Sequence, residues 1–431
     1  MKSVESAKYK EIKMTENRKL IKIATAGSVD DGKSTLIGRL LYDTGSLTTD
    51  KLEAIERNSK QRGYDYLDFS LATDGLVAER EQGITIDVAH IYFNTDKTNF
   101  IVADTPGHVE YTRNMVTGAS TSQVAIILID ARKGVIEQTY RHFFISNLLR
   151  LSHVVVAVNK MDLVDYDEEV YLKIKSDFEE LVAKSDFQSE QITFIPISAL
   201  KGENVSEKSE LMNWYIGNTL LDHLEVLEPQ DLQESSSARF PVQFVIRPKT
   251  EAYHDFRGFA GKVYGGSLKK GDLITVLPSL TESKIKSIHF FENELEEAIP
   301  GSSVTITLED EVNVSRGDTI VKTNDLPQSE KSIAATICQV NSKPLRVGDK
   351  YTLQHGVNRV LAKVESIQAR IHTDFSGEEA TDQLKLNDIG KVSFRLSKAI
   401  HFDSYKQNKS TGSFILIDEG SFDTVSVGFI N

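Results

Sequence analysis

The chain has 431 residues, of which 40% are hydrophobic and 26% charged, and its formal net charge is −13. A chain of this length is usually too long to fold around one hydrophobic core, so two or three domains are expected. The acidic balance disfavours a broad surface for nucleic acid. The single cysteine, Cys338, excludes an internal disulfide and a cysteine-based zinc cluster, and its apolar surroundings predict a buried thiol.

Residues 1–19 are polar and mixed in charge, which predicts a flexible segment that leads into the first strand. They contain no apolar signal segment. No apolar run in the sequence approaches the roughly 18 residues that a membrane span requires. We therefore expect a cytoplasmic protein that is not associated with a membrane.

Residues 20–225 alternate apolar strands with amphipathic helices, the pattern of a doubly wound α/β domain, here a P-loop GTPase domain predicted at residues 20–232. Between the first apolar run and a helical pattern, Gly27–Ser34 (GSVDDGKS) matches the phosphate-binding loop G-x-x-x-x-G-K-[ST] in full. In such a loop successive backbone N–H groups point at phosphate oxygens. Lys33 reaches the β- and γ-phosphates and Ser34 ligates Mg²⁺. The alternative is a structural glycine-rich turn.

The segment EREQGIT (residues 79–85) supplies the next candidate, Thr85. A threonine in a mobile switch segment ligates Mg²⁺ and orders the segment only in the triphosphate state. The alternative is an ordinary strand threonine. The strand-like run Ile84–Phe93 is predicted to pair with the apolar strand Phe100–Ala103.

The motif DTPGH (residues 104–108) directly follows the strand Phe100–Ala103. Its position predicts that Asp104 holds the metal through a water molecule. The Gly107 N–H is predicted to meet the γ-phosphate.

Two further motifs follow later strands, NKMD at residues 159–162 and SAL at residues 198–200. The Asp162 carboxylate can accept hydrogen bonds from N1–H and the 2-amino group of guanine, whereas adenine would leave it unpaired. The backbone at residues 198–200 is predicted to cap the guanine carbonyl. Singly, these residues could be a helix cap and a plain turn. Four motifs in order at strand ends instead predict a GTP site.

A polar stretch at residues 228–238 is typical of a linker, and after it the alternating pattern of strands and helices gives way to short β-rich runs. Short β-rich runs between glycines and charged turns predict a small antiparallel barrel at residues 239–323. A polar joint at residues 323–331 leads to a second β-rich block at residues 330–431, predicted as another barrel.

EREQGIT, DTPGH and NKMD together resemble the translation-factor class of GTPases, in which a nucleotide domain precedes two β-barrels. Within that class, GSVDDGKSTLIGRLLYDT, FRGFAGKVYGGSLKKGD and YKQNKSTGSFILID resemble the large, GTP-hydrolysing subunits of sulfate adenylyltransferase, over roughly residues 18–431. The resemblance implies a GTPase that couples hydrolysis to the synthesis of adenosine 5′-phosphosulfate and diphosphate. ATP and sulfate would bind a separate small catalytic subunit, the partner in a heterodimer or a multiple of it.

The resemblance also assigns roles residue by residue. The catalytic residues would be Lys33, Thr85 and His108, with His108 orienting the attacking water where small GTPases use glutamine. Mg²⁺ would be held by Ser34, Thr85 and, through water, Asp104. The residues that would hold GTP are Gly27, Asp30, Gly32, Lys33, Ser34, Thr35, Asp104, Gly107, Asn159, Lys160, Asp162, Ser198 and Leu200.

Some features stay open at this point. Asp31 is given no role other than capping the helix that follows it. A translation factor that delivers aminoacyl-tRNA shares the fold, GTP and Mg²⁺, and a regulatory switch without metabolic coupling is a third interpretation. The sequence shows no second nucleotide motif, and in particular no Ser-Gly-Gly-rich loop for ATP pyrophosphate.

Overall fold

The computed structural model describes residues 18–61, 63, 66–69, 88–106, 112–228, 237–248, 256–291 and 293–431, with the backbone alone at residues 112 and 113. The chain divides into two compact units. The first is Met1–Gln230 with Thr373–Ser376, and the second is Asp231–His372 with Gly377–Asn431.

The first unit is built on a sheet with strand order β2-β3-β1-β4-β5-β6. β2 and β3 are antiparallel and the other neighbours are parallel. Every residue of β4 is buried, as are all but the first of β5, because central parallel strands are covered on both faces. The predicted pairing of the strand before β3 with β3 is confirmed for the described residues, because β2 pairs with β3 along its whole length. The strands are β1 (Lys19–Ala26), β2 (Ala89–Asn94), β3 (Thr98–Asp104), β4 (Val124–Asp130), β5 (His153–Asn159) and β6 (Ile192–Pro196).

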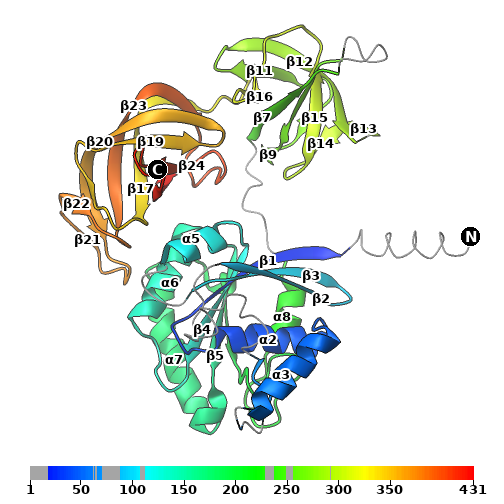
Figure 1. Ribbon diagram of the computed structural model, residues 1–431, viewed down its shortest axis with the longest axis vertical. Helices are drawn as coiled ribbons and strands as arrows, with labels where there is room; N and C mark the ends of the chain where they lie inside the picture. The colour runs from blue at the N-terminus through cyan, green and yellow to red at the C-terminus, as the bar shows by residue number, and fades with distance from the viewer. Residues whose placement is uncertain are drawn as a thin grey trace, which may run out of the picture. The chain divides into compact units, whose positions relative to one another are not determined.

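Helices cover both faces of this sheet, with α5, α6 and α7 on one face and α2, α3 and α8 on the other (Figure 1). Apolar side chains of β1, α2 and α8, among them Ile21, Leu36 and Leu220, share one core cluster. Because β3, β1, β4, β5 and β6 are parallel, their carboxyl ends meet at one edge of the sheet, where ligands bind in sheets of this kind. The helices are α2 (Lys33–Asp43), α3 (Thr49–Gln61), α5 (Thr112–Ser120), α6 (Glu137–Leu148), α7 (Glu168–Val182) and α8 (Leu220–Val226), with 3₁₀ turns η3 (Met161–Val164) and η4 (Ser189–Gln191).

The second unit contains two closed antiparallel barrels. In the first, the described strands run in the order β11-β16-β7-β8-β15-β12, and the pairing of β11 with β12 closes the ring. Phe240, Phe259 and Ile306 belong to its core. The strands are β7 (Ala238–Ile246), β8 (Gly258–Lys262), β11 (Leu273–Leu277), β12 (Thr281–Phe290), β15 (Ser303–Leu308) and β16 (Thr319–Lys322), with short β9 (Tyr264–Gly265), β10 (Leu268–Lys269), β13 (Asn293–Leu295) and β14 (Glu297–Ala298).

The second barrel has the order β19-β24-β25-β17-β23-β20 and closes through β19 and β20. Tyr351, Phe394 and Phe414 fill its core. Its strands are β17 (Gln328–Gln339), β19 (Lys350–His355), β20 (Asn358–Ile371), β23 (Ile389–Phe402), β24 (Ser413–Ile417) and β25 (Thr424–Ile430), with short β18 (Leu345–Arg346), β21 (Glu378–Glu379) and β22 (Gln383–Leu384). The predicted fold class, an α/β domain followed by two antiparallel barrels, is confirmed.

One local expectation differs from the structure. β17 begins at Gln328, inside the stretch 323–331 that its polarity marked as a joint. The first residues of β17 are exposed, so they pair with β23 without burying their side chains. Cys338 lies on the same strand and is fully buried, as predicted.

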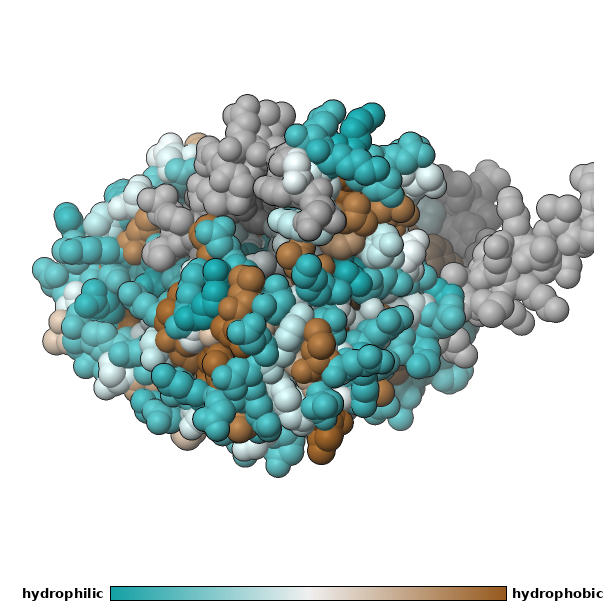
Figure 2. Space-filling view, turned by 90° about the horizontal axis from the view of Figure 1, so that it is seen from below, coloured by the Kyte–Doolittle hydropathy of each residue, from teal (hydrophilic) through white to brown (hydrophobic). Residues whose placement is uncertain are grey.

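The surface seen in Figure 2 is mainly hydrophilic, and its apolar residues form small groups. Scattered apolar residues of this kind are usual on a protein surface. Within the part of the chain that the structure describes, no helix is both long and apolar enough to cross a membrane.

Candidate nucleotide site

The loop between β1 and α2 has the backbone shape of a phosphate cradle. Asp30 and Gly32 adopt left-handed conformations, with φ of 68° and 94°. Gly32 is the N-cap of α2, and among the described residues no side chain accepts a cap hydrogen bond from the first turn of that helix. The free N–H groups and the helix dipole together favour an anion at this place.

Lys33, the first residue of α2, lies folded over the loop. Its Nζ donates to the carbonyl oxygens of Gly27, at 2.8 Å, and Ser28, at 3.0 Å. Burial lowers the pKa of this ammonium group, while nearby Asp104 and Asp31 oppose the shift. Among the described residues no carboxylate forms an ion pair with Lys33, so a buried cation is held ready for an anionic ligand.

The expectation that Asp31 caps the following helix is wrong. Its Oδ2 accepts from the N–H of Ser28 at 2.6 Å, so the side chain turns back into the loop. Oδ1 lies 3.6 Å from Lys133 Nζ and has no hydrogen-bond partner in the described structure. Burial raises the pKa of this carboxyl group. Asp31 therefore stabilises the loop rather than the helix, because its carboxylate accepts from a loop N–H and makes no cap hydrogen bond to α2.

Asn159, at the end of β5, joins the phosphate loop to the predicted base-binding segments. Its Nδ2 donates to the Asp31 carbonyl oxygen at 2.8 Å, and its Oδ1 accepts from the Ala199 N–H at 2.9 Å. The side chain is almost fully buried. One amide thus fixes the relative positions of the loop and the segment after β6.

Asp162 lies in η3, directly after β5, and is held by the segment after β6. Its Oδ1 accepts from the Ser198 hydroxyl at 2.6 Å. Ser198 Oγ also accepts from the Lys201 N–H at 3.2 Å. The Leu200 carbonyl accepts from Arg39 of α2 at 3.5 Å. The predicted base motif and the SAL segment therefore lie together, and the Ser198 hydroxyl orients the Asp162 carboxylate.

The structure adds Asp130, a residue that the sequence analysis did not select. Lys160 Nζ lies 3.0 Å from Asp130 Oδ2 and also donates to the Asp30 carbonyl. Burial alone would raise the pKa of Asp130, but hydrogen bonds from Arg132 and Lys160 hold it well below its usual range. Asp130 thus anchors Lys160 across the loop. The sequence signal that could have identified Asp130 is its position at the end of β4, because the other motifs also follow the ends of strands.

Two oxygen donors of the predicted metal site lie near Lys33. Ser34 and Thr35 are half-buried in the first turn of α2. Asp104, at the end of β3, is buried and accepts from the Thr25 hydroxyl at 3.2 Å. Hydroxyl and carboxylate oxygens are suitable ligands for Mg²⁺. The remaining candidates, Thr85, Gly107 and His108, lie outside the described residues.

Gly32 provides a direct test of this geometry. A Cβ at Gly32 would lie 2.5 Å from Asn159 Nδ2, and its φ of 94° is strained for an L-residue. We expect Gly32→Ala to weaken GTP binding by about tenfold or more, because strain of about 1–3 kcal/mol is added and the Asn159 bridge is displaced.

The matched control is Gly45→Ala, which also has positive φ, at 65°, but has nothing within 4 Å of a new Cβ. Titration with a fluorescent guanine nucleotide should show normal affinity for this control. Similar losses in the two variants would contradict the proposed contact between Gly32 and Asn159.

Comparison with known proteins adds independent evidence. Residues 18–230 match the family model described as the elongation factor Tu GTP binding domain, and residues 332–431 match a GTP-eEF1A C-terminal domain-like model. A sulfate adenylyltransferase subunit 1 from Colwellia psychrerythraea is 47% identical over 97% of this chain and 89% of the relative. The chain belongs to the sulfate adenylyltransferase subunit 1 family. It therefore carries a GTP-binding domain of the elongation factor Tu type.

Other relatives agree with membership of this family. A sulfate adenylyltransferase subunit 1 from Bacteroides fragilis is 47% identical over 96% of this chain and 86% of its own. A bifunctional enzyme CysN/CysC from Mycobacterium tuberculosis is 46% identical over 95% of this chain and 67% of its own. The solved Ski7 GTPase-like domain of S. cerevisiae has a TM-score of 0.53, with 18% identity over 98% of this chain and 99% of that one, and supports the fold alone.

Proposed function

We propose that this chain is the GTP-hydrolysing subunit of a sulfate adenylyltransferase. It would couple GTP cleavage to the formation of adenosine 5′-phosphosulfate and diphosphate from ATP and sulfate on a separate small catalytic subunit. The observation that carries the proposal is the Asn159 bridge, which joins a phosphate loop and a guanine-type motif in one site. The full-length relationship to subunits 1 of sulfate adenylyltransferase supplies the metabolic context.

Within this proposal, the phosphate loop binds the phosphates and Asp162 selects guanine. Lys33 leaves the loop carbonyls for the β- and γ-phosphates when nucleotide binds. His108 orients the attacking water, Thr85 orders the first switch, and Gly107 donates to the γ-phosphate. The domains would be residues 20–232, 239–323 and 330–431, after a segment at residues 1–19.

The residues present fit a magnesium ion. Ser34 makes no hydrogen bond through its hydroxyl in the described structure, and Asp104 places a buried carboxylate beside Thr25. We infer that Ser34 and Thr85 are direct ligands and that Asp104 acts through water. A bound Mg²⁺ neutralises charge that develops on the phosphate oxygens. The protein's own part is to hold these oxygens and Lys33 around one phosphate position.

The division of labour follows from chemistry. Formation of a phosphosulfate anhydride from ATP and sulfate is strongly uphill, so a second exergonic reaction must be coupled to it. The sequence contains one nucleotide motif and no ATP-pyrophosphate loop, so adenylyl transfer belongs to the partner. We infer that both subunits act in the cytoplasm, where ATP and GTP are available.

His108→Ala tests the proposed chemistry. We expect GTP affinity to stay nearly unchanged while turnover falls by about two orders of magnitude or more, because a group that orients water acts chiefly in the transition state. Equilibrium binding and single-turnover hydrolysis separate the two effects. His90→Ala is the control, since His90 is an exposed histidine of the edge strand β2. Equal losses of binding and rate would make His108 a structural residue.

A further inference from the structure

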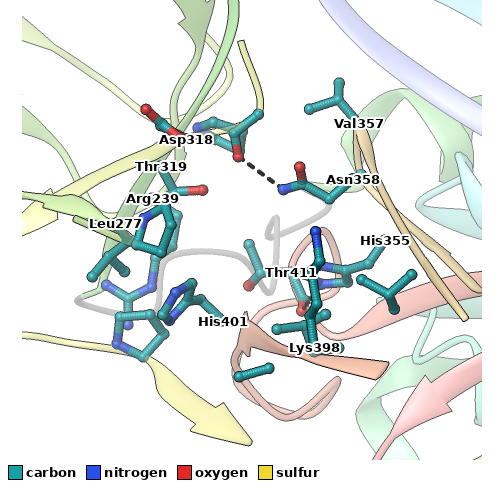
Figure 3. Close-up of a pocket in the computed structure, with 18 of the residues that line it drawn as sticks. Arg239, Leu277, Asp318, Thr319, His355, Val357, Asn358, Lys398, His401 and Thr411 are labelled. Carbon is teal, nitrogen blue, oxygen red and sulfur yellow. Dashed lines mark hydrogen bonds between the residues drawn. The ribbon is translucent and has the colours of Figure 1, made fainter. Parts of the chain in front are cut away.

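A cavity of about 270 Å³ lies between the two barrels of the second unit (Figure 3). One wall comes from the first barrel, at the ends of β7 and β11 and the loop that precedes β16. The opposite wall comes from the β19–β20 hairpin, the end of β23 and residues 410 and 411. The cavity is remote in sequence from every motif of the nucleotide site.

A bidentate ion pair between Arg239 and Asp403 forms the floor of the cavity. The Arg239 guanidinium of the first barrel donates to both carboxylate oxygens of Asp403 in the second, at 2.9 and 2.8 Å. Thr411 Oγ1 donates to the same carboxylate at 2.6 Å. Arg239 is only 2% exposed. Arg239 also lies 3.4 Å from the Asp325 carboxylate, so two carboxylates neutralise its charge, and the two barrels are joined at this point.

The mouth is also bridged. Asn358 Nδ2, on the hairpin of the second barrel, donates to the Gly317 carbonyl of the first at 2.8 Å, as Figure 3 shows. The neighbouring Asp318 carboxylate accepts from the Ser315 N–H at 2.8 Å. The cavity therefore has fixed walls, and one of its two carboxylates is engaged by its own loop.

The remaining charges of the lining are positive. Beyond the Arg239–Asp403 pair, the lining contains Arg316, Arg359 and Lys398 against Asp318, a net charge of three minus one, or +2, on a chain whose net charge is −13. In the part of the structure that is described, Arg316 and Lys398 have no ion-pair partner. Such a cationic hollow on an acidic protein focuses its field on small anions.

Two histidines add hydrogen-bonding capacity. His355 is buried, and its Nε2 lies 2.7 Å from the Thr411 carbonyl oxygen. His401 is half-buried and makes no hydrogen bond to a described residue. Burial lowers the pKa of both rings and so favours their neutral form. Figure 3 shows the Lys398 amino group and both rings directed into the space between the walls.

The lining also includes the apolar residues Leu277, Pro278, Val357 and Ile400, next to the hydroxyl groups of Thr319 and Ser410. The volume is near the lower limit of ligand pockets, which is about 300 Å³. This combination suits a small molecule with one anionic group and a less polar body.

We propose that this cavity binds a small molecule that carries a phosphate or sulfate group. Arg316 and Lys398 pair with the oxyanion, and the His401 ring N–H donates a hydrogen bond to it. The body of the ligand packs against the apolar wall. The inference does not depend on the GTPase chemistry, since it concerns another unit of the chain.

Isothermal titration of the full chain tests the proposal. The protein is saturated with GDP and Mg²⁺ so that the phosphate loop is filled, and the probes are AMP, adenosine 5′-phosphosulfate, inorganic phosphate and inorganic sulfate. We expect saturable binding of at least one probe. The double variant Arg316→Ala, Lys398→Ala should weaken it by about tenfold or more, because two charge-assisted contacts are lost.

The control is Lys385→Ala, which removes an exposed lysine of the same barrel outside the cavity and should leave binding unchanged. Equal affinity for inorganic and adenosine-linked anions would support the oxyanion contacts and contradict the packing of a ligand body against the apolar wall. Tighter binding of the adenosine compounds would support both the oxyanion contacts and the contact between the ligand body and the apolar wall. Absence of saturable binding with all four probes, or unchanged affinity in the double variant, would overturn the proposal.

Discussion

Replacing Asp162 with asparagine is expected to change the preferred nucleotide of the protein from GTP to xanthosine triphosphate. In the proposed site the carboxylate would accept two hydrogen bonds from guanine, whereas an amide can donate to the 2-oxo group of xanthine. The Ser198 hydroxyl, 2.6 Å from Asp162 Oδ1, can keep the new side chain in place. The loss for GTP should be a few kcal/mol, or roughly a hundredfold to ten-thousandfold.

Competition of the two nucleotides against a fluorescent analogue measures this exchange. Asp165→Asn is a matched control, because Asp165 is exposed, lies in the same segment and has a φ of 52°, which asparagine tolerates. The control should keep the preference for GTP. An unchanged preference in Asp162→Asn would show that the base binds elsewhere.

Replacing Lys33 with alanine is expected to reduce GTP hydrolysis by about a hundredfold to a thousandfold or more. The ammonium group is buried and donates to loop carbonyls, and in the proposed site the phosphates would replace these carbonyls. Single-turnover hydrolysis measures the loss. Lys173→Ala, which removes an exposed lysine of α7, should hydrolyse GTP normally.

The unfolding temperature of the nucleotide-free protein provides a check on this second prediction. Removing a buried cation that has no carboxylate partner among the residues that the structure describes should not destabilise the fold. A large fall in the unfolding temperature of Lys33→Ala would instead attribute the lost activity to misfolding.

The sequence predicted the sheet well because local patterns determine it, and the nucleotide-site residues stay a prediction that rests on the same patterns. β4 and β5 are continuous apolar runs that can only be buried, and each motif follows the end of such a strand. The side-chain bonds of Asn159 could not be read from the motif, since they depend on the register of β5 against β6.

Other features depend on contacts between segments that are distant in sequence. Asp130 supports Lys160 only because β4 and β5 are neighbours in the sheet. The cavity between the barrels brings Arg316 and Lys398 together from segments 82 residues apart, and neither belongs to a motif. The direction of the Asp31 side chain depends on the curvature of the loop, which residue types alone do not determine.

The most direct test of the central claim is the simultaneous measurement of GDP and adenosine 5′-phosphosulfate in a mixture of this chain, its small subunit, ATP and GTP, with and without sulfate. We predict that sulfate accelerates GDP formation and that the phosphosulfate rises above the level that ATP alone supports. Lys33→Ala should abolish this excess and leave the uncoupled synthesis by the partner. GDP formation that ignores sulfate, with product at the uncoupled equilibrium, would contradict the account and direct attention to GTP-dependent binding of aminoacyl-tRNA.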